Sequence, residues 1–364
     1  MLRARPVLHV ERDAYCQRVL ALRFPGVPLE PDIERLEPDA IPDADLWCGG
    51  FPCQDISPAG KGAGIHGERS RLWREWARLI TAAKPPWVLI ENHPALRRRG
   101  LDVVLADLHA AGYDARWLRL SAWDVGAWHW RERLWIAAGS RWTWAAPGLF
   151  SSWTGMLPRD GVMVDGHVYP MEPVTSGKPP KDVPRLLPDL DVVRENVARI
   201  QRERACLPTA TAGDAKASGS RCTEQSRAHP GVSLTDAIVH GGDAGGRSAL
   251  PTAEASDWKS GTGSDHGDHA PPLSSALGGL LNPGWEEPFM GFPVGWTDLH
   301  VDEPRTLELP AAWLDSSWLA DAPPPTVQPR IVEARRQRVH ALGNAVVPQA
   351  VERAAEMLLP SARP

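Results

Sequence analysis

The sequence has only five cysteines, and they follow no regular spacing. This excludes the dense disulfide framework of small secreted domains and favours a reducing compartment. The sequence also shows no signal peptide and no apolar run near the ~20 residues that span a bilayer. We therefore expect a cytoplasmic protein with no membrane partner.

Phenylalanine and tyrosine are scarce too, with five and three residues beside 17 tryptophans. Stacking on nucleic-acid bases is one explanation for such a balance. Ordinary packing or a coding bias explains it better, because the tryptophans are spread along the whole chain. The net charge of −5 argues against a protein that coats nucleic acid indiscriminately, but it does not exclude a local basic cleft.

The length of 364 residues predicts two domains of the usual size. From residue 7 to about 140, short apolar runs alternate with helical patterns. The apolar runs predict buried strands at Val7–Val10, Ala44–Trp47, Trp87–Ile90, Ala115–Leu120 and Leu134–Ala138. The helical patterns cover Asp13–Phe24, Arg71–Ala83 and Leu101–Ala111. This alternation predicts an α/β protein with an open parallel sheet and helices on both of its faces.

Reactive side chains lie beside several of these strands. Glu11 follows the first strand, Cys53 follows the second in "GGFPCQDIS", and Glu91 ends the third in "WVLIENHPAL". Arg131 and Arg133 precede the last strand in "WHWRERLWIAA". In such sheets ligands bind beyond the carboxyl ends of the strands. Thiol, carboxylate and guanidinium groups at these positions therefore predict one enzyme site.

These motifs resemble those of the DNA (cytosine-5-)-methyltransferases, particularly the phage and restriction-modification type. "GGFPCQDIS" resembles the nucleophile motif of that family, "ENHPAL" its Glu-Asn motif and "WHWRERLWIAA" its Arg-x-Arg motif. "FMGFPVGWTDL" is similar to the motif after the target-recognition region, and "ALGNAVVP" to the C-terminal Gly-Asn motif. The order and approximate spacing agree over residues 7–140 and 282–352, which makes the resemblance specific.

The resemblance implies a Rossmann-like S-adenosylmethionine-dependent methyltransferase with a smaller, loop-rich target-recognition domain. The implied reaction transfers a methyl group from S-adenosylmethionine to carbon 5 of a flipped-out cytosine in a specific duplex DNA sequence. Cys53 would add to carbon 6 of the base as a thiolate. Glu91 would hold or donate a proton at ring N3. Arg131 and Arg133 would supply positive charge, with Arg133 nearer the base.

The resemblance also implies the groups that contact the cofactor. Glu11 would accept hydrogen bonds from the ribose hydroxyls, as an acid after a Rossmann-type strand does. Asp32 and Ile33 resemble the pair that contacts the adenine ring. The remaining positions that match the cofactor side are Pro52, Leu72, Asn344 and Val346. We expect a monomer that acts on duplex DNA and needs no metal.

The expected domains follow from the same motifs. Residues 1–140 would form the N-terminal part of the catalytic domain, and residues 300–364 would return to it. Residues 141–299 would form the target-recognition region, with a flexible stretch at 206–275 that is rich in Gly, Ser, Thr and Asp.

Each candidate residue also has an ordinary structural interpretation. Cys53 would be a buried thiol, Glu91 a surface acid at a strand end, and Arg131 and Arg133 a solvated strand edge. Gly343-Asn344 would be a plain helix-entry turn. We favour the functional interpretation for these residues because the motifs occur together and in order.

For three other features the ordinary interpretation is better. Cys48 has neither the spacing nor the histidine partners of a zinc ligand, so we expect a structural thiol. Arg97–Arg99 is best explained as a solvated run, with a phosphate contact as the alternative. "SDHGDH" (Asp265–His269) is best explained as a polar linker, with a metal site as the alternative.

The sequence departs from the family at three places. His93 stands where an aliphatic residue is usual, and Trp128-His129 stands where Pro-Gln is usual. The strand and Gly-rich F-x-G-x-G loop with which the family begins do not precede Val7. Without that strand, the strands at Val7 and Ala44 lose their shared neighbour, and unpaired strand edges are costly. A start codon assigned too late and a decayed gene are both open explanations.

Two other functions stay open at this point. One is a remnant that binds DNA without holding S-adenosylmethionine. The other is a thiol enzyme that methylates or hydroxymethylates pyrimidine nucleotides, against which the long region 141–285 argues.

Overall fold

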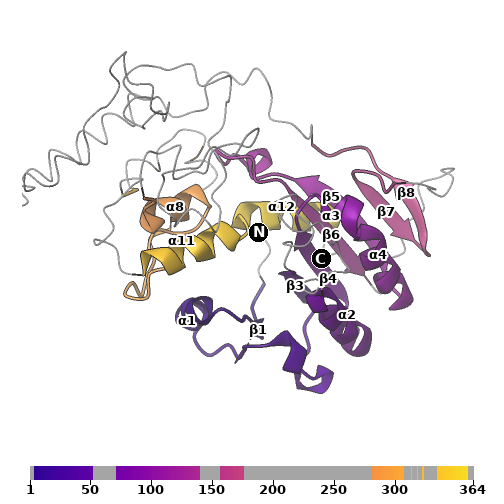
Figure 1. Ribbon diagram of the computed structural model, residues 1–364, viewed down its shortest axis with the longest axis horizontal. Coiled ribbons are helices and arrows are strands. Elements are labelled where there is room, and N and C mark those ends of the chain that lie inside the picture. The colour runs from indigo at the N-terminus through magenta and orange to yellow at the C-terminus, as the bar shows by residue number, and fades with distance from the viewer. Residues whose placement is uncertain are drawn as a thin grey trace, which may run out of the picture.

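The computed structural model describes residues 4–51, 71–139, 156–175, 280–306, 313, 318, 322–323 and 334–359. Its strands form two sheets (Figure 1). The smaller is a two-stranded sheet in which β1 (His9–Val10) pairs in parallel with β2 (Leu29–Glu30). The larger has six strands in the order β3-β4-β6-β5-β7-β8. Its strands are β3 (Leu46–Gly50), β4 (Trp87–Asn92), β5 (Asp114–Leu120), β6 (Arg133–Gly139), β7 (Gly161–Val164) and β8 (His167–Pro170).

The α/β class is confirmed, but the expectation of a parallel sheet is wrong. β3 and β4 are parallel, whereas β6 lies antiparallel between β4 and β5. The connection from β5 to β6 holds only a short 3-10 helix, η5 (Trp123–Val125), among its residues. A parallel neighbour is usually reached through a crossover that contains an α-helix, and residues 121–132 contain none. The chain therefore turns back and enters the sheet in the opposite direction.

Helices cover both faces of the six-stranded sheet (Figure 1). The helices that matter for the site are α1 (Ala14–Arg23), α2 (Arg71–Ala83), α3 (Leu96–Arg99), α4 (Leu101–Ala110), α8 (Pro283–Phe289), α11 (Arg335–Asn344) and α12 (Pro348–Leu358). Within the described ranges, no helix combines the length and apolar character needed to cross a bilayer.

Alternating side chains of the sheet separate two hydrophobic cores. Val88 and Ile90 of β4 pack in a cluster with residues of α2 and α4. Leu89, between them, packs in a second cluster with residues of α8 and α12. This alternation is what a strand buried on both faces requires. The sheet therefore forms the middle layer of the molecule.

The helix boundaries largely follow the sequence pattern. α2 spans the residues that its apolar spacing predicted. Asp13 caps α1 by accepting hydrogen bonds from the backbone N–H groups of Tyr15 and Cys16. Gly112, just beyond α4, adopts a φ of +84°, which suits glycine.

The extent of β3 differs from the expected Ala44–Trp47. The strand begins at Leu46 and continues through Gly50, because its backbone stays paired with β4 as far as Glu91. Gly49 and Gly50 have low β-propensity, so the sequence does not predict that the strand includes them. Only the neighbouring strand reveals this part of β3.

The large number of tryptophans is explained by packing as far as the structure describes them. Trp73, Trp117, Trp313 and Trp318 are each at most 1% exposed. Trp128 also contributes to the core, and its indole N–H donates to the carbonyl of Trp313 at 2.8 Å.

The described parts of the central region pack with the six-stranded sheet. β7 pairs with β5, and β8 pairs with β7, so residues 161–170 extend this sheet. Trp285 and Phe289 of α8 share a core with Leu118 of β5. The boundaries at 141 and 299 stay predictions. The expected flexible stretch at 206–275 and the "SDHGDH" segment lie outside the described residues.

β1 and β3 belong to different sheets, as the sequence led us to expect. β1 pairs only with β2 among the described strands, and β3 lies at the edge of the larger sheet. The small sheet is therefore held to the rest of the molecule by side chains and helices.

Candidate active site

Glu91 and Arg133 form an ion pair at the carboxyl end of β4. The Nε atom of Arg133 lies 2.8 Å from Oε1 of Glu91, and both side chains are about one-fifth exposed, at 22% and 19%. Burial raises the pKa of Glu91, and the positive charges of Arg133 and Arg131 oppose this shift without cancelling it. The carboxyl group therefore keeps a proton to a higher pH than an ordinary glutamate does.

The end of β3 is held tightly against Glu91 and its neighbour. The side-chain amide of Asn92 donates a buried hydrogen bond of 3.0 Å to the carbonyl of Phe51. Gly50 pairs with Glu91, and a Cβ atom at Gly50 would lie 2.8 Å from Oε2 of Glu91. A side chain at position 50 would therefore displace the carboxylate. Pro52 and Cys53 follow directly but lie outside the described residues.

Arg131 connects this region to the C-terminal motif. Its guanidinium donates to the carbonyl of Gly343 at 3.0 Å and also to the carbonyl of Ala345. The residue is 6% exposed, so it does not lie on a solvated edge. Its φ of +25° is unusual for a residue with a side chain. Gly343 and Asn344 end α11 and do not open a helix.

Glu11 directly follows β1, and Asp32 is the second residue after β2. Because the two strands are parallel, their carboxyl ends lie at the same edge. Oε1 of Glu11 accepts a hydrogen bond of 2.7 Å from the backbone N–H of Asp13. Oδ1 of Asp32 accepts one of 3.1 Å from the backbone N–H of Glu34. Both carboxylates are thus oriented by the following turn.

The other expected cofactor residues divide between two parts of the fold. Ile33 and Leu72 pack, partly buried, against the core that α2 and α4 share. Val346 packs against the core on the opposite face of the sheet. The side-chain amide of Asn344 lies 3.2 Å from Nε2 of His340. The structure therefore gathers the expected residues into an N-terminal and a C-terminal group.

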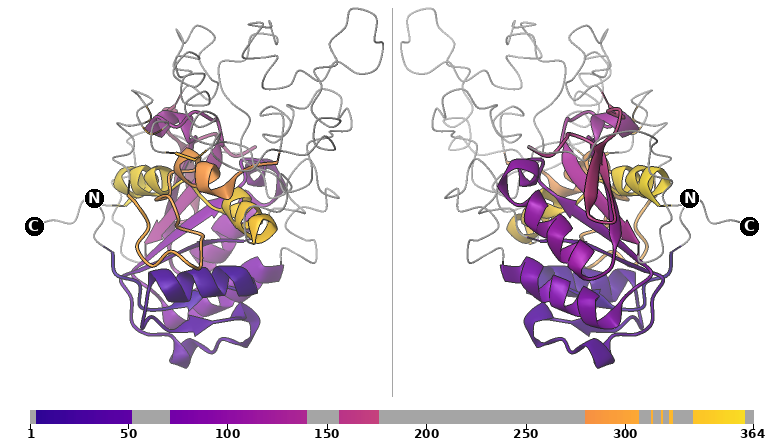
Figure 2. Two further views of the ribbon diagram at one scale, coloured as in Figure 1. Left: turned by 90° about the vertical axis from the view of Figure 1, so that its left-hand side faces the viewer. Right: turned by 90° about the vertical axis from the view of Figure 1, so that its right-hand side faces the viewer.

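An electrostatic interaction between Asp13 and His340 shows that the N-terminal and C-terminal groups lie near each other. Burial alone would raise the pKa of Asp13, but hydrogen bonds from Cys16 and Tyr15 and the charge of His340 lower it overall. Asp13 lies two residues from Glu11, and His340 contacts Asn344. The ribose-side and C-terminal candidates therefore lie on neighbouring elements. α1 lies next to α11 in each view (Figures 1 and 2).

His93 lies beside the ion pair and is held neutral. Its Nδ1 accepts a hydrogen bond of 3.1 Å from the backbone N–H of Ala95. Burial, together with the charges of Arg133 and Arg99, lowers the pKa of His93 to about 4. The unusual residue at this position therefore adds no positive charge at neutral pH.

Two contacts near the site were not predicted from the sequence. Asn92 belongs to the Glu-Asn motif, but its contact with Phe51 spans 41 residues and has no local signal. Arg97, in the basic run, donates to the carbonyl of Leu157 at 2.6 Å. One arginine of that run is thus bound to backbone, while Arg98 is exposed.

The ion pair between Arg133 and Glu91 leads to a prediction for the pKa of Glu91. Replacing Arg133 with methionine should raise the pKa of Glu91 further, because the favourable charge is lost while burial remains. A ¹³C NMR titration of the glutamate carboxyl carbons, assigned with Glu91→Gln, measures this pKa. Arg98→Met, which removes an exposed arginine, should leave it unchanged. An unchanged or lowered pKa in Arg133→Met would contradict the pairing.

The raised pKa of Glu91 also determines how one contribution to the free energy of unfolding changes with pH. A carboxyl whose pKa is raised by folding binds its proton more tightly in the folded chain than in the unfolded chain. Its contribution to the free energy of unfolding is therefore largest below the ordinary glutamate pKa. That contribution is lost as the pH rises through the raised pKa.

Part of the chain is similar in sequence to known proteins. Residues 2–143 match the family model described as C-5 cytosine-specific DNA methylase. The type II methyltransferase M2.BsuMI of Bacillus subtilis (strain 168) is 33% identical over 177 residues, which cover 46% of this chain and 41% of that protein. M.DsaV of Dactylococcopsis salina is 35% identical over 134 residues, which cover 36% and 38% of the two chains.

The match thus spans about two fifths of the length of these relatives. Among solved structures, the Entamoeba histolytica methyltransferase EhMeth superposes with a TM-score of 0.48 and 13% sequence identity, over 96% of this chain and 88% of the other.

Proposed function

We propose that this chain methylates carbon 5 of cytosine in a specific sequence of duplex DNA, because residues 2–143 match the model of the C-5 cytosine-specific DNA methylase family. The observation that carries the proposal is the convergence of Glu91, Arg133 and the end of β3. Phe51 is fastened to Asn92 by a hydrogen bond, and Cys53 follows two residues later.

The residue types suit the chemistry of cytosine. Carbon 5 is too electron-poor to attack a methyl donor directly. The thiolate of Cys53 forms a bond to carbon 6, which moves electron density to carbon 5. Glu91, whose pKa is raised by burial, holds a proton at ring N3 and so offsets the added negative charge. After methylation, carbon 5 loses its proton to a base or water, and the bond from sulfur to carbon 6 breaks.

The positively charged groups have separate tasks. Arg133, paired with Glu91 at 2.8 Å, keeps the carboxyl oriented and supplies charge beside the base. Arg131 is engaged with the carbonyls of Gly343 and Ala345 and holds the C-terminal turn in place. The base reaches this site by leaving the duplex stack, as it does in base-flipping enzymes. Residues 141–299 would read the surrounding sequence through the major groove.

The described residues fit part of S-adenosylmethionine, which supplies the methyl group when bound. Glu11 offers a carboxylate, oriented by the N–H of Asp13, to the ribose hydroxyls. Asp32 and Ile33 lie after the adjacent strand β2 and suit the adenine ring. Asn344 and Val346 approach from the C-terminal side, while Leu72 and Pro52 complete the proposed set.

One observation favours a second candidate function. Within the described ranges, no strand joins β1 to β3, so the small sheet that carries Glu11 is not continuous with the sheet that carries Glu91. A chain that binds duplex DNA but holds S-adenosylmethionine weakly would have this structure.

Methyl transfer from labelled S-adenosylmethionine to unmethylated duplex DNA of mixed sequence tests the proposal. The chain should be compared with a version extended upstream in its gene. Label in carbon 5 of cytosine supports the proposal, and free deoxycytidine monophosphate should remain unlabelled. DNA retention without cofactor binding by calorimetry would favour the second function. If neither version transfers label while Cys53 stays open to alkylation, the proposed activity is wrong.

A further inference from the structure

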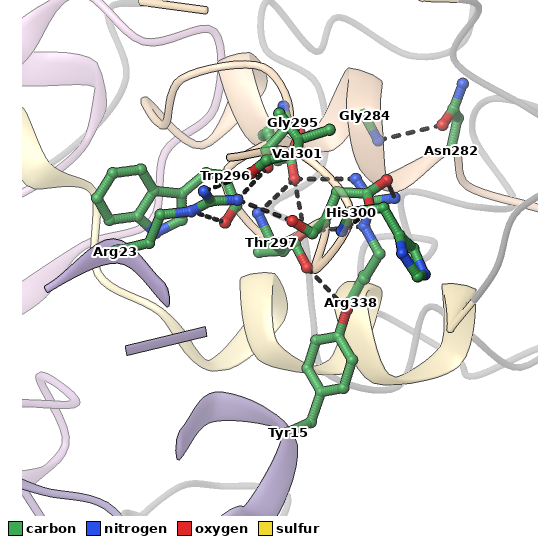
Figure 3. A network of polar contacts seen from close by, with 12 residues as sticks. Tyr15, Arg23, Asn282, Gly284, Gly295, Trp296, Thr297, His300, Val301 and Arg338 are labelled. Carbon is green, nitrogen blue, oxygen red and sulfur yellow. Dashed lines mark hydrogen bonds and ion pairs between the residues drawn. The ribbon is translucent and has the colours of Figure 1, made fainter. Parts of the chain in front are cut away.

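Arg23 is the last residue of α1. Backbone carbonyls of the loop 295–302 surround its guanidinium group. The guanidinium donates to five backbone carbonyls of this loop at 2.6–3.2 Å (Figure 3). The guanidinium carbon also lies 5.7 Å from the centroid of the Trp296 ring. The acceptors are the carbonyls of Gly295, Trp296, Asp298, Val301 and Asp302. A planar guanidinium with five N–H donors suits such a ring of acceptors, and an ammonium does not.

The loop 295–302 is itself held firmly by side chains of α8 and α11. Glu287, which is fully buried, accepts hydrogen bonds from the backbone N–H groups of Gly295 and Thr297 at 2.6 and 2.8 Å. Arg338 of α11 pairs with Glu287 at 3.0 Å and with Asp298 at 2.7 Å. The loop therefore presents its carbonyls to Arg23 in a fixed arrangement (Figure 3).

Other contacts near Arg23 extend the same attachment to β1. The hydroxyl of Tyr15 donates to the carbonyl of Thr297 at 2.7 Å. The ring of Phe24 lies 6.0 Å from that of Trp296 and 5.0 Å from that of His9 in β1. Both ends of α1 are thus attached to one loop, about 280 residues away in the sequence.

This attachment matters because β1 has no strand neighbour in the larger sheet. Side chains therefore set the position of β1 relative to α11. Those of α1 contact the loop 295–302, and this loop is paired with Arg338 of α11. On the far side of the small sheet, Arg78 of α2 donates to the carbonyl of Leu36 at 2.9 Å, which holds the chain after β2. On the β1 side, Arg23 and Tyr15 donate the hydrogen bonds that join α1 to the loop 295–302.

We propose that Arg23 is a positioning residue for the cofactor site. It holds β1 and Glu11 against the loop 295–302 and so sets their distance from Asn344 and Val346, at and beyond the end of α11. The inference rests on the proposed function for the identity of the ligand, S-adenosylmethionine. The attachment of α1 to the loop 295–302 is independent of the proposed function. The guanidinium of Arg23 is occupied by the loop carbonyls, so the role proposed for it is one of positioning.

Hydrogen–deuterium exchange of the full chain tests the attachment without any ligand. The amides of His9 and Glu11 donate to the carbonyls of Pro28 and Glu30 and report on the small sheet. In Arg23→Met their exchange should be at least tenfold faster, while the amides of β4 and β6 change less than twofold. Arg23→Lys should fall between Arg23→Met and the unaltered chain, because it keeps the charge but loses the five-donor geometry.

Arg18→Met is the matched control on the same helix. Arg18 lies over the ring of Tyr15 at 5.2 Å and donates to none of the loop carbonyls. Its removal should leave the exchange of His9 and Glu11 unchanged. Equal exchange in Arg23→Met and Arg18→Met would overturn the proposal. Faster exchange throughout the chain in Arg23→Met would overturn it too, since that indicates only general destabilisation.

Calorimetry with S-adenosylmethionine separates this inference from the proposed function. Arg23→Met should raise the Kd for the cofactor at least tenfold and leave retention on duplex DNA unchanged. Equal cofactor affinity in Arg23→Met and the unaltered chain would overturn the positioning role. If the unaltered chain binds no cofactor, the proposed function fails, and the exchange rates alone decide whether Arg23 holds β1 in place.

Discussion

Replacing Cys53 with serine is expected to lower methyl transfer to duplex DNA at least about a thousandfold, because the step that activates carbon 5 needs a thiolate. A serine hydroxyl has a far higher pKa and adds to carbon 6 too slowly. The effect should appear in turnover and leave retention on DNA nearly unchanged. Transfer of labelled methyl groups, measured beside a DNA retention assay, separates these two quantities.

A trapping experiment gives a second measure of the same bond. With duplex DNA that carries 5-fluorocytosine, carbon 5 has no proton to lose after methylation, so the bond between Cys53 and carbon 6 should persist. The adduct should be visible as a protein of increased mass on a denaturing gel. Cys48→Ser is the matched control, since Cys48 is an exposed thiol in β3. An adduct that survives in Cys53→Ser would assign the nucleophile to another residue.

Replacing Arg338 with methionine is expected to lower the free energy of unfolding by about 3–5 kcal/mol. Arg338 is 5% exposed and its partner Glu287 is 0% exposed, so the variant leaves a buried carboxylate without its guanidinium. Arg338 also donates to the hydroxyl of Thr297 at 3.0 Å, and that bond is lost as well. Urea unfolding monitored by tryptophan fluorescence measures the change.

The control for this prediction is an arginine in an exposed pair. Arg353 lies 3.2 Å from Glu356, with side chains 55% and 46% exposed, and Arg353→Met should change the free energy of unfolding by less than about 1 kcal/mol. Adding Glu287→Gln to Arg338→Met should recover part of the loss, because no charge then remains buried. A similar loss in Arg353→Met, or no recovery in the double variant, would refute the account.

The local pattern of the sequence predicted the elements that need no distant partner to be recognised. α2 is visible because its apolar residues recur at helical spacing, and β4 because its apolar run is continuous and ends before Pro94. The positions of Glu91 and Arg133 beside strand ends also followed from order along the chain. The roles proposed for them stay predictions until the variants are measured.

Other features depend on partners that lie far away in the sequence. The last residues of β3 form a strand only because β4 pairs with them. The antiparallel direction of β6 is visible only in its pairing with β4 and β5. Arg131 and Arg133 differ by two positions, yet Arg131 bonds a carbonyl 212 residues away while Arg133 pairs with Glu91. No local pattern distinguishes the two side chains.

The sequence by itself thus determined the α/β class and the order of the motifs along the chain, since both depend on periodicity and on neighbouring residues. Only the tertiary structure decided which groups meet: the carboxyl of Glu91 with Arg133, and Arg23 with the loop 295–302. The physical reason is that hydrogen bonds and ion pairs act over about 3 Å. Such a distance is set by the packing of whole elements, which the local sequence does not describe.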